Sequence, residues 1–153
     1  MVDLDEHYMS LSIKEAQKAQ DKEEVPVGAV IVLDGQIIGR AHNQVEMLKD
    51  ATAHAEMIAI TQAESHVKDW RLDGCTLYVT KEPCFMCAGA LVQARVSRLV
   101  FGVRDVKAGG AGSAMNLVQE PKLNHWVEVT SGVKEEECKA ILQAFFKRLR
   151  SIE

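Results

Sequence analysis

The sequence contains no long apolar segment. Its 153 residues include no run of about 18 apolar side chains, the length that a membrane-spanning helix needs. The longest candidate, Val25 to Leu33, is interrupted by Pro26 and Gly28. The chain begins Met-Val-Asp-Leu-Asp-Glu-His, which is acidic where a secretory signal is basic and then apolar. We therefore expect a cytoplasmic protein with no membrane partner.

The chain also lacks an excess of positive charge, internal repeats, low-complexity tracts and linkers. Its formal net charge is −4, which gives no general argument for nucleic-acid binding. That charge does not exclude such binding, because phosphates are bound by local basic patches. The length suits one compact domain and is too short for two ordinary ones. We therefore expect a single domain over residues 1–153.

Cysteine is scarce, with four residues in the chain. In a reducing cytosol these cysteines are not expected to form a disulfide framework, and metal ligands, nucleophiles or buried apolar residues are more common roles. Cys84 and Cys87 have the C-x-x-C spacing, whereas Cys75 and Cys138 stand alone. The pair is therefore the first place to look for chemistry.

The hydrophobic pattern predicts helices that alternate with short strands. Helices are expected over residues 4–22, 52–66, 84–94 and 135–152, and strands over 27–33, 36–41, 75–80, 98–103 and 126–130. Asp34-Gly35 predicts a hairpin between the first two strands, and the strand–helix–strand order over 75–103 predicts a right-handed parallel crossover. Segments 42–50 and 104–113 are expected to be loops. The predicted fold is α/β, a three-layer α/β/α sandwich around a mixed five-stranded sheet.

Two short clusters carry metal-binding chemistry. They are Ala53-His-Ala-Glu56 and Glu82-Pro-Cys-Phe-Met-Cys87, each at a predicted helix N-terminus, where the helix dipole favours thiolate over thiol. Zinc accepts two thiolates and an imidazole readily, so we expect His54, Cys84 and Cys87 to hold one zinc ion. Three protein ligands leave the fourth position for water, whose pKa falls toward neutrality and which then supplies a hydroxide nucleophile.

Glu56 is the natural proton carrier for such a site. It lies two residues beyond His54, so it is near the metal without having to bind it. In a hydrolytic deamination it can take a proton from the metal-bound water and deliver protons to the ring nitrogen and the departing amine. A partly desolvated pocket lets the carboxylate hold that proton.

Other interpretations of these residues stay open. A lone C-x-x-C can be redox-active or accidental, and a zinc ion closed by a fourth protein ligand would be structural. Cys75 is the obvious fourth ligand, although it lies in a strand pattern and is expected to pack as a small apolar residue. His66 and Cys138 are further alternatives. A zinc-stabilised interaction module without catalysis is therefore a competing hypothesis.

Taken together, H-x-E followed by P-C-x-x-C resembles the cytidine/deoxycytidylate deaminase superfamily. Within it, the chain is similar to the bacterial TadA-type tRNA adenosine deaminases, with the cytidine-deaminase-like fold that this implies. The matching stretches lie at residues 26–30, 52–56, 76–80, 82–90, 101–105, 107–113 and 145–148. The metal motifs identify the superfamily, whereas the loop from Arg104 and the Phe145-Phe-Lys-Arg148 tail point to the tRNA branch.

The resemblance implies hydrolytic deamination of adenosine to inosine at the wobble position of a tRNA anticodon. A zinc-activated hydroxide would attack C6 of adenine, with Glu56 as the proton shuttle. The family pattern implies a homodimer with one Zn²⁺ per subunit, and a tRNA anticodon stem-loop that crosses both subunits. The residues that it assigns to substrate binding are Asn43, Ala55, Asp105, Lys107, Phe145 and Arg148.

The residues themselves support these assignments unevenly. The amide of Asn43 can donate and accept, which suits a purine edge, although loop asparagines often satisfy turns. The basic tail beside Phe145 and Phe146 suits phosphates and an unstacked base, although one of these aromatics can instead pack in the core. Gln44 stands where the family often has arginine. The alternative function is deamination of a free base or nucleotide, such as cytosine, guanine or deoxycytidylate, which needs no basic tail.

Overall fold

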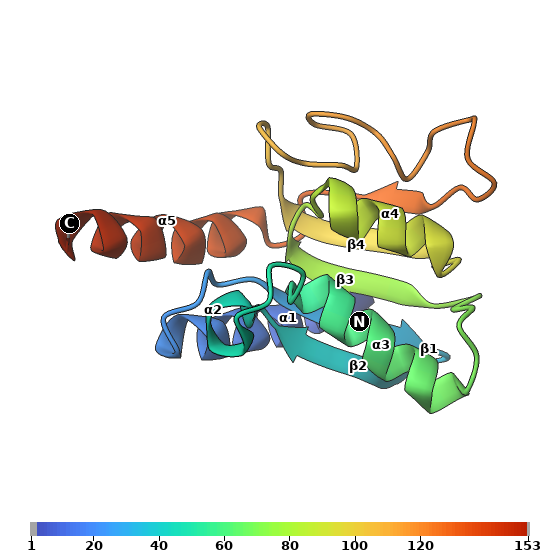
Figure 1. Ribbon diagram of the computed structural model, residues 1–153, viewed down its shortest axis with the longest axis horizontal. Helices are drawn as coiled ribbons and strands as arrows, with labels where there is room; N and C mark the ends of the chain where they lie inside the picture. Colours follow the sequence, from blue (N-terminus) through green and yellow to red (C-terminus); the bar gives the residue numbers. More distant parts are fainter. Residues whose placement is uncertain (1–2, 153) are drawn as a thin grey trace.

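The computed structural model of the chain describes residues 3–152, so Met1, Val2 and Glu153, which the expected domain includes, lie outside the described residues. Helices and strands alternate along the chain (Figure 1). The elements are α1 (Leu4–Asp21), β1 (Gly28–Leu33), β2 (Gln36–His42), α2 (Val45–Leu48), α3 (Ala55–Val67), β3 (Thr76–Lys81), α4 (Phe85–Gln93), β4 (Arg98–Val103), β5 (Glu128–Thr130) and α5 (Glu135–Ile152).

The five strands form one mixed sheet in the order β2-β1-β3-β4-β5. β1 pairs antiparallel with both β2 and β3, whereas β3–β4 and β4–β5 are parallel. The β1–β2 hairpin turns at Asp34 and Gly35, whose positive φ angles of 50° and 77° match the twist of the flanking strands. The predicted hairpin, the parallel pairing across α4 and the mixed five-stranded sheet are confirmed.

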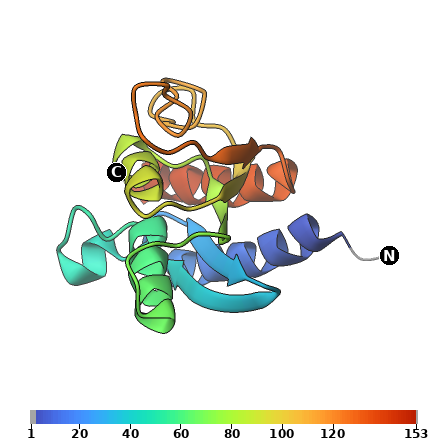
Figure 2. The same ribbon diagram turned by 90° about the vertical axis from the view of Figure 1, so that its right-hand side faces the viewer.

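Both faces of the sheet are buried, because successive side chains of each central strand enter different cores. On β3, Leu77 and Val79 pack with the core under α3 and α4, whereas Tyr78 packs with the core under α1 and α5. β1 and β4 alternate in the same way. Figures 1 and 2 show the resulting layers, with α3 and α4 over one face of the sheet and α1 and α5 over the other.

Several boundaries differ from the predicted ones. The predicted loop 42–50 contains the short helix α2, because the buried Glu24 carboxylate accepts hydrogen bonds from the N–H groups of Glu46 and Met47 at 3.0 and 2.7 Å. α3 begins at Ala55 rather than at Thr52, whose N–H and hydroxyl instead bond to Asp50 in a local turn.

The other differences lie after β4 and at the site itself. β5 covers only Glu128–Thr130, and Trp126, predicted to start it, is 61% exposed. The irregular segment after β4 therefore runs from residue 104 to residue 127. α4 begins at Phe85, one residue after the predicted start, which leaves Cys84 as the residue before the helix.

No helix among residues 3–152 is long and apolar enough to cross a membrane. α5 is anchored by three buried side chains, Cys138, Leu142 and Phe145, all of which precede its last seven residues. Its C-terminal half projects beyond the sheet (Figure 1). The C-terminal half lies next to the N-terminal ends of α3 and α4, since Phe145, Phe146 and Leu149 line a cavity with His54 and Cys84. This arrangement places a basic helix beside the predicted metal site.

Candidate active site

The three predicted metal ligands lie at the N-termini of two neighbouring helices. His54 is the N-cap of α3 and Cys84 the N-cap of α4, both with extended backbone. The His54 side chain makes no cap hydrogen bond within α3. Its ring nitrogen instead contacts Cys84 and Cys87, the second of which lies in the first turn of α4. The prediction that one helix contains both cysteines is wrong by one residue, because α4 begins at Phe85 and so excludes Cys84.

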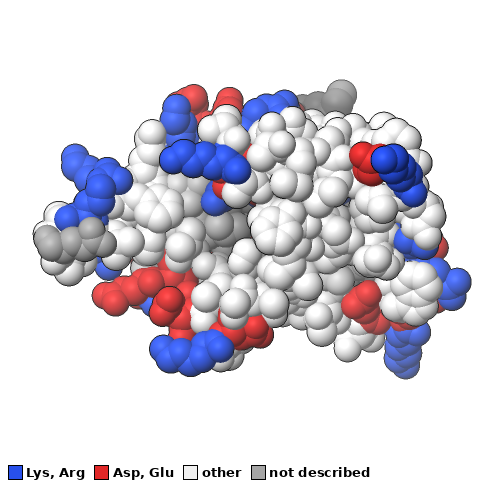
Figure 3. All heavy atoms as spheres, turned by 45° about the horizontal axis from the view of Figure 1, so that its top comes forward, with Lys and Arg blue, Asp and Glu red and all other residues white. Residues whose placement is uncertain are grey.

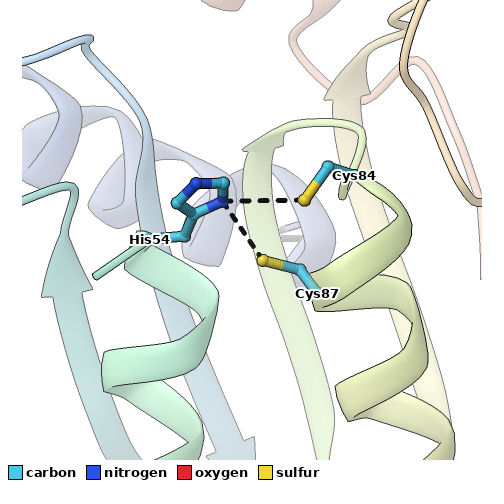
Figure 4. A group of neighbouring side chains, drawn as sticks. All are labelled: His54, Cys84 and Cys87. Carbon is cyan, nitrogen blue, oxygen red and sulfur yellow. Dashed lines mark hydrogen bonds between the residues drawn. The ribbon is translucent and has the colours of Figure 1, made fainter. Parts of the chain in front are cut away.

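The donor atoms are spaced as a tetrahedral metal requires (Figure 4). His54 Nδ1 lies 3.6 Å from Cys84 Sγ and 3.4 Å from Cys87 Sγ. A tetrahedral zinc with Zn–S bonds of about 2.3 Å and Zn–N bonds of about 2.0 Å sets nitrogen and sulfur about 3.5 Å apart. Among residues 3–152, this is the only group of three or more His, Cys, Asp and Glu side chains whose ligand atoms all lie within 4.8 Å of one another. The residues fit a three-ligand metal site.

The contacts among the three ligands shift their pKa values in different directions. Hydrogen bonding from Cys87, followed by that from His54, lowers the pKa of the Cys84 thiol far below its ordinary value. The same contact with Cys84, together with burial, raises the pKa of the Cys87 thiol. The hydrogen bond with Cys84 raises the pKa of His54. His54 and Cys87 thus hold their protons more tightly than usual, and a metal ion would displace these protons on binding.

The two other cysteines take no part in the site. Cys75 lies in the core under α3 and α4, and Cys138 in the core under α1 and α5, both without solvent exposure. Burial raises the pKa of Cys75 to about 11 and that of Cys138 to about 12, so neither is a thiolate at neutral pH. A fourth protein ligand from Cys75, Cys138 or His66 is thus absent from the described cluster.

Glu56 lies in the first turn of α3, two residues from His54, and is 4% exposed. Burial raises the pKa of its carboxyl group, and this effect outweighs the opposite influences of a hydrogen bond from its own backbone N–H and of the His54 charge. A carboxyl group that holds a proton more readily than usual is suited to proton transfer. Its side chain lines the same cavity as His54 and Cys84.

The cavity has a volume of about 620 Å³, within the range of small-molecule sites. Its wall contains predicted site residues from five separate segments, namely Asn43, His54, Ala55, Glu56, Cys84, Asp105 and Phe145. Cys87 is fully buried behind it. Lys107 and Arg148 are exposed and do not line the cavity. Of the two aromatics in the tail, Phe145 is 8% exposed and Phe146 is 38% exposed, so Phe145 is the buried one.

Asn43 has an unsatisfied polar atom at this wall. Its side-chain Nδ2 donates to the Val25 carbonyl at 3.3 Å, and its N–H donates to the Val27 carbonyl at 3.1 Å. Its buried Oδ1 accepts no hydrogen bond from any described residue. A buried acceptor without a donor is costly, so the cavity favours a ligand that brings an N–H or O–H group.

Sequence reasoning missed Glu82, whose side chain holds the loop after β4 in place. It is 2% exposed, and its carboxylate accepts the N–H groups of Asp105, Ala111 and Ser113 at 3.0, 3.0 and 3.1 Å, together with the Ser113 hydroxyl. A Cβ at Gly109 would overlap this carboxylate, so glycine is required there. The only available signal was an acidic residue directly before the Pro-Cys motif.

Glu24 was missed for a similar reason. It lies in an acidic stretch, residues 21–24, yet it is 2% exposed and holds the start of α2 against the cavity wall. Nothing in the local sequence distinguishes Glu24 from its neighbour Glu23, whose side chain is 81% exposed. Its partners lie more than twenty residues away, at Glu46 and Met47.

Comparison with known proteins gives a consistent family assignment. The model of the MafB19-like deaminase family matches residues 4–150. The chain is 56% identical to the tRNA-specific adenosine deaminase of Bacillus subtilis (strain 168), over 95% of this chain and 91% of that protein. It is 48% identical to the tRNA-specific adenosine deaminase of Aquifex aeolicus (strain VF5), over 95% of this chain and 96% of that one.

Solved structures agree. A structure from a study of A-to-I editing by tRNA:A34 deaminases at the wobble position of transfer RNA superposes with a TM-score of 0.86 and 44% identity, over 89% of this chain and 99% of that chain. A guanine deaminase from Nitrosomonas europaea has a TM-score of 0.78 at 22% identity, over 92% of this chain and 83% of that chain. The second comparison supports the cytidine-deaminase-like fold alone.

The ligand set predicts how metal content responds to single cysteine changes. We expect the purified protein to hold about one zinc ion per chain, and Cys87→Ser to reduce this to a small fraction after dialysis against a chelator. Cys75→Ser is the matched control, because Cys75 is equally buried but distant from the ligand cluster. Mass-spectrometric metal analysis would contradict the assignment if Cys75→Ser lost the ion to the same extent.

The Glu82 contacts predict a loop that opens when the carboxylate is replaced. Glu82→Gln must turn an NH₂ group toward backbone N–H donors, which should cost about 1–3 kcal/mol of unfolding free energy. Urea denaturation measures that loss, and hydrogen exchange should show faster exchange over residues 105–113. Glu136→Gln, an exposed change on α5, serves as the control. Equal stability of the two variants would show that the contacts contribute nothing.

Proposed function

The chain belongs to the family of tRNA-specific adenosine deaminases, and from its site we propose that it converts adenosine to inosine at the wobble position of a tRNA anticodon. One observation carries the proposal. A three-ligand metal site lies at the wall of a cavity of about 620 Å³ that also holds the buried Glu56. An incomplete ligand set leaves a coordination position for chemistry, as in catalytic rather than structural zinc sites.

We propose that one zinc ion binds to His54, Cys84 and Cys87 in each chain. Two sulfur donors and one imidazole form a ligand set that zinc accepts readily. When bound, the ion lowers the pKa of a coordinated water and so supplies a nucleophile at neutral pH for attack on C6 of adenine. The N-termini of α3 and α4 contribute positive dipole ends that stabilise the thiolates.

Glu56 is proposed to move the protons. Deamination at C6 requires a proton to leave the attacking water, and it requires protons to reach the ring N1 and the departing ammonia. A buried carboxyl group with a raised pKa can accept the first proton and then donate it, because it holds a proton more readily at neutral pH. Its position in the first turn of α3 keeps it beside the metal ligands throughout.

The remaining cavity residues are proposed to bind the base and its backbone. The Asn43 amide oxygen accepts a hydrogen bond from the purine edge, since no described residue donates to it. Ala55 contributes wall surface and one of the α3 N–H groups that have no acceptor within the helix. We propose further contacts to RNA from Asp105, Lys107, Phe145 and Arg148.

Asp105, Lys107 and Arg148 have different surroundings. Asp105 is held by Lys81 at 3.0 Å and forms a tight turn by accepting the Lys107 N–H at 3.1 Å, which leaves the exposed Lys107 side chain available to RNA. Arg148 lies 3.7 Å from the exposed Glu23, a weak surface pair that a phosphate can displace.

We propose one deaminase domain over residues 1–153 and a cytoplasmic location, where its tRNA substrate is found.

The proposed function is tested by comparing substrates. We expect an anticodon stem-loop with adenosine at the wobble position to yield inosine, and free adenine, cytosine, guanine and their nucleosides to react far more slowly. Nucleoside analysis of the digested RNA and an ammonia assay measure the two arms. Ammonia release from a free base at the rate found with the stem-loop would instead support the free-base alternative.

The same assay separates catalysis from a merely structural zinc module. Glu56→Ala should keep its zinc and its fold but lower turnover by roughly 10²–10⁴-fold, the usual contribution of a positioned acid–base group. Glu64→Ala, on the same helix and outside the cavity, is the matched control. Full activity of Glu56→Ala would exclude Glu56 as the proton carrier.

We further propose that the chain forms a homodimer through α4. This helix has no charged residue, its Phe85 is 62% exposed, and a Cβ at Gly89 would meet nothing within 4 Å. An uncharged, exposed helix face of this kind is typical of an interface between copies. Analytical ultracentrifugation should give twice the chain mass of 16.9 kDa, and Phe85→Glu should give the single-chain mass. A wild-type protein that sediments as one chain would contradict the dimer.

A further inference from the structure

Glu82 lies between the segment that carries the cysteine ligands and the loop after β4. It follows β3 directly and stands two residues before Cys84, and its N–H donates to the Val103 carbonyl at 2.8 Å, just before that loop begins. Figure 3 shows charged side chains mainly near the edge of one face of the molecule. The Glu82 side chain, by contrast, is 2% exposed. Its charge therefore acts inside the molecule, where it needs hydrogen-bond donors.

Each oxygen of the Glu82 carboxylate accepts two hydrogen bonds from the loop. Oε1 accepts the Asp105 N–H at 3.0 Å and the Ser113 hydroxyl. Oε2 accepts the N–H groups of Ala111 and Ser113 at 3.0 and 3.1 Å. Hydrogen bonds to an ionised acceptor are roughly twice as strong as neutral ones. A side-chain amide cannot replace this carboxylate, because its nitrogen donates and accepts nothing, whichever way the amide is turned.

The same loop packs against the backbone of a metal ligand. Cys84 pairs with Gly109 in an isolated antiparallel bridge, and the Gly110 N–H donates to the Pro83 carbonyl at 2.7 Å. A Cβ at Gly110 would lie 2.9 Å from the Ala88 Cβ and 3.1 Å from the Cys84 carbonyl oxygen, so the loop approaches the start of α4 very closely. The loop positions that the carboxylate holds thus flank the two positions that contact the ligand segment.

We propose that Glu82 is a positioning residue for the metal site, and that it fixes Cys84 through the loop. The inference rests on the metal binding proposed above. Cys84 precedes the first helical residue of α4 and has an extended backbone, so its orientation depends on contacts from outside the helix. The loop supplies these contacts. Glu82 itself does not belong to the ligand cluster, so it acts on the metal only through the backbone that it holds.

The test measures metal affinity and ligand geometry in folded variants. Glu82→Gln should raise the dissociation constant for Zn²⁺ roughly 10–100-fold in competition with a chromophoric chelator, the usual effect of removing a group that orients a metal ligand. The visible d–d bands of the Co²⁺-loaded protein, which depend on coordination geometry, should shift or weaken. Ser113→Ala removes only one of the four hydrogen bonds and should change both measurements in the same direction by less.

Asp5→Asn is the matched control for general loss of stability. The Asp5 carboxylate accepts two hydrogen bonds from Arg98 at 2.8 and 2.7 Å and one from the Tyr78 hydroxyl at 3.1 Å. Asp5 lies on α1, over the face of the sheet opposite α3 and α4 (Figure 2). Its replacement should lower the free energy of unfolding but leave the zinc affinity and the Co²⁺ spectrum as in wild type.

The outcomes separate this role from the proposed function. If wild type binds zinc and Glu82→Gln matches it in affinity and spectrum, Glu82 stabilises the loop alone and the positioning role fails, while the metal site stands. If Glu82→Gln does not fold, an unchanged affinity and spectrum in Ser113→Ala would overturn the inference. Equal losses in Asp5→Asn would assign the effect to general destabilisation. If wild type binds no zinc, the metal site and the inference both fail.

Discussion

The whole site depends on the meeting of two helix N-termini at one point. His54 precedes α3, and Cys84 precedes α4, with Cys87 one turn further along α4. The nitrogen-to-sulfur distances of 3.4 and 3.6 Å leave room for one tetrahedral ion and for little else. The sheet fixes this meeting, because α3 packs on β1 and β2 while α4 connects the parallel strands β3 and β4. A shift of either helix by one residue would separate the ligands.

Buried carboxylates build the walls around this point. Glu24 accepts two backbone N–H groups at the start of α2, and Glu82 accepts three in the loop after β4. Each carboxylate thus fixes a distant segment of the chain through hydrogen bonds to the backbone of that segment. The acidic composition of the chain is thus partly structural, since these two charges are used inside the molecule and are not displayed to a polyanion. The cations on α5 remain exposed, so an acidic protein still offers a basic track.

The sequence predicted the fold closely because its signals were local. The central residues of β1, β3 and β4 form short, nearly continuous apolar runs, as expected of strands that are buried on both faces, and Asp34-Gly35 is a strong hairpin signal. Prediction failed where distant residues decide local structure. α2 forms because Glu24 caps it from a different segment, and α3 starts late because Thr52 bonds to Asp50. The hydrogen bonds of Glu82 join residues more than twenty positions apart in the sequence. The hydrophobic periodicity of a segment carries no information about such contacts.

By itself, the sequence determined which side chains can bind a metal and carry a proton. The spacing of His54, Glu56, Cys84 and Cys87 specifies residue types whose chemistry is intrinsic. Only the tertiary structure decided which other residues are their neighbours. It placed Asn43 at the cavity wall with a buried oxygen to which no described residue donates, and it excluded Cys75 from the ligand set. The physical reason is that ligand chemistry belongs to single side chains, whereas burial and proximity depend on how the whole chain packs.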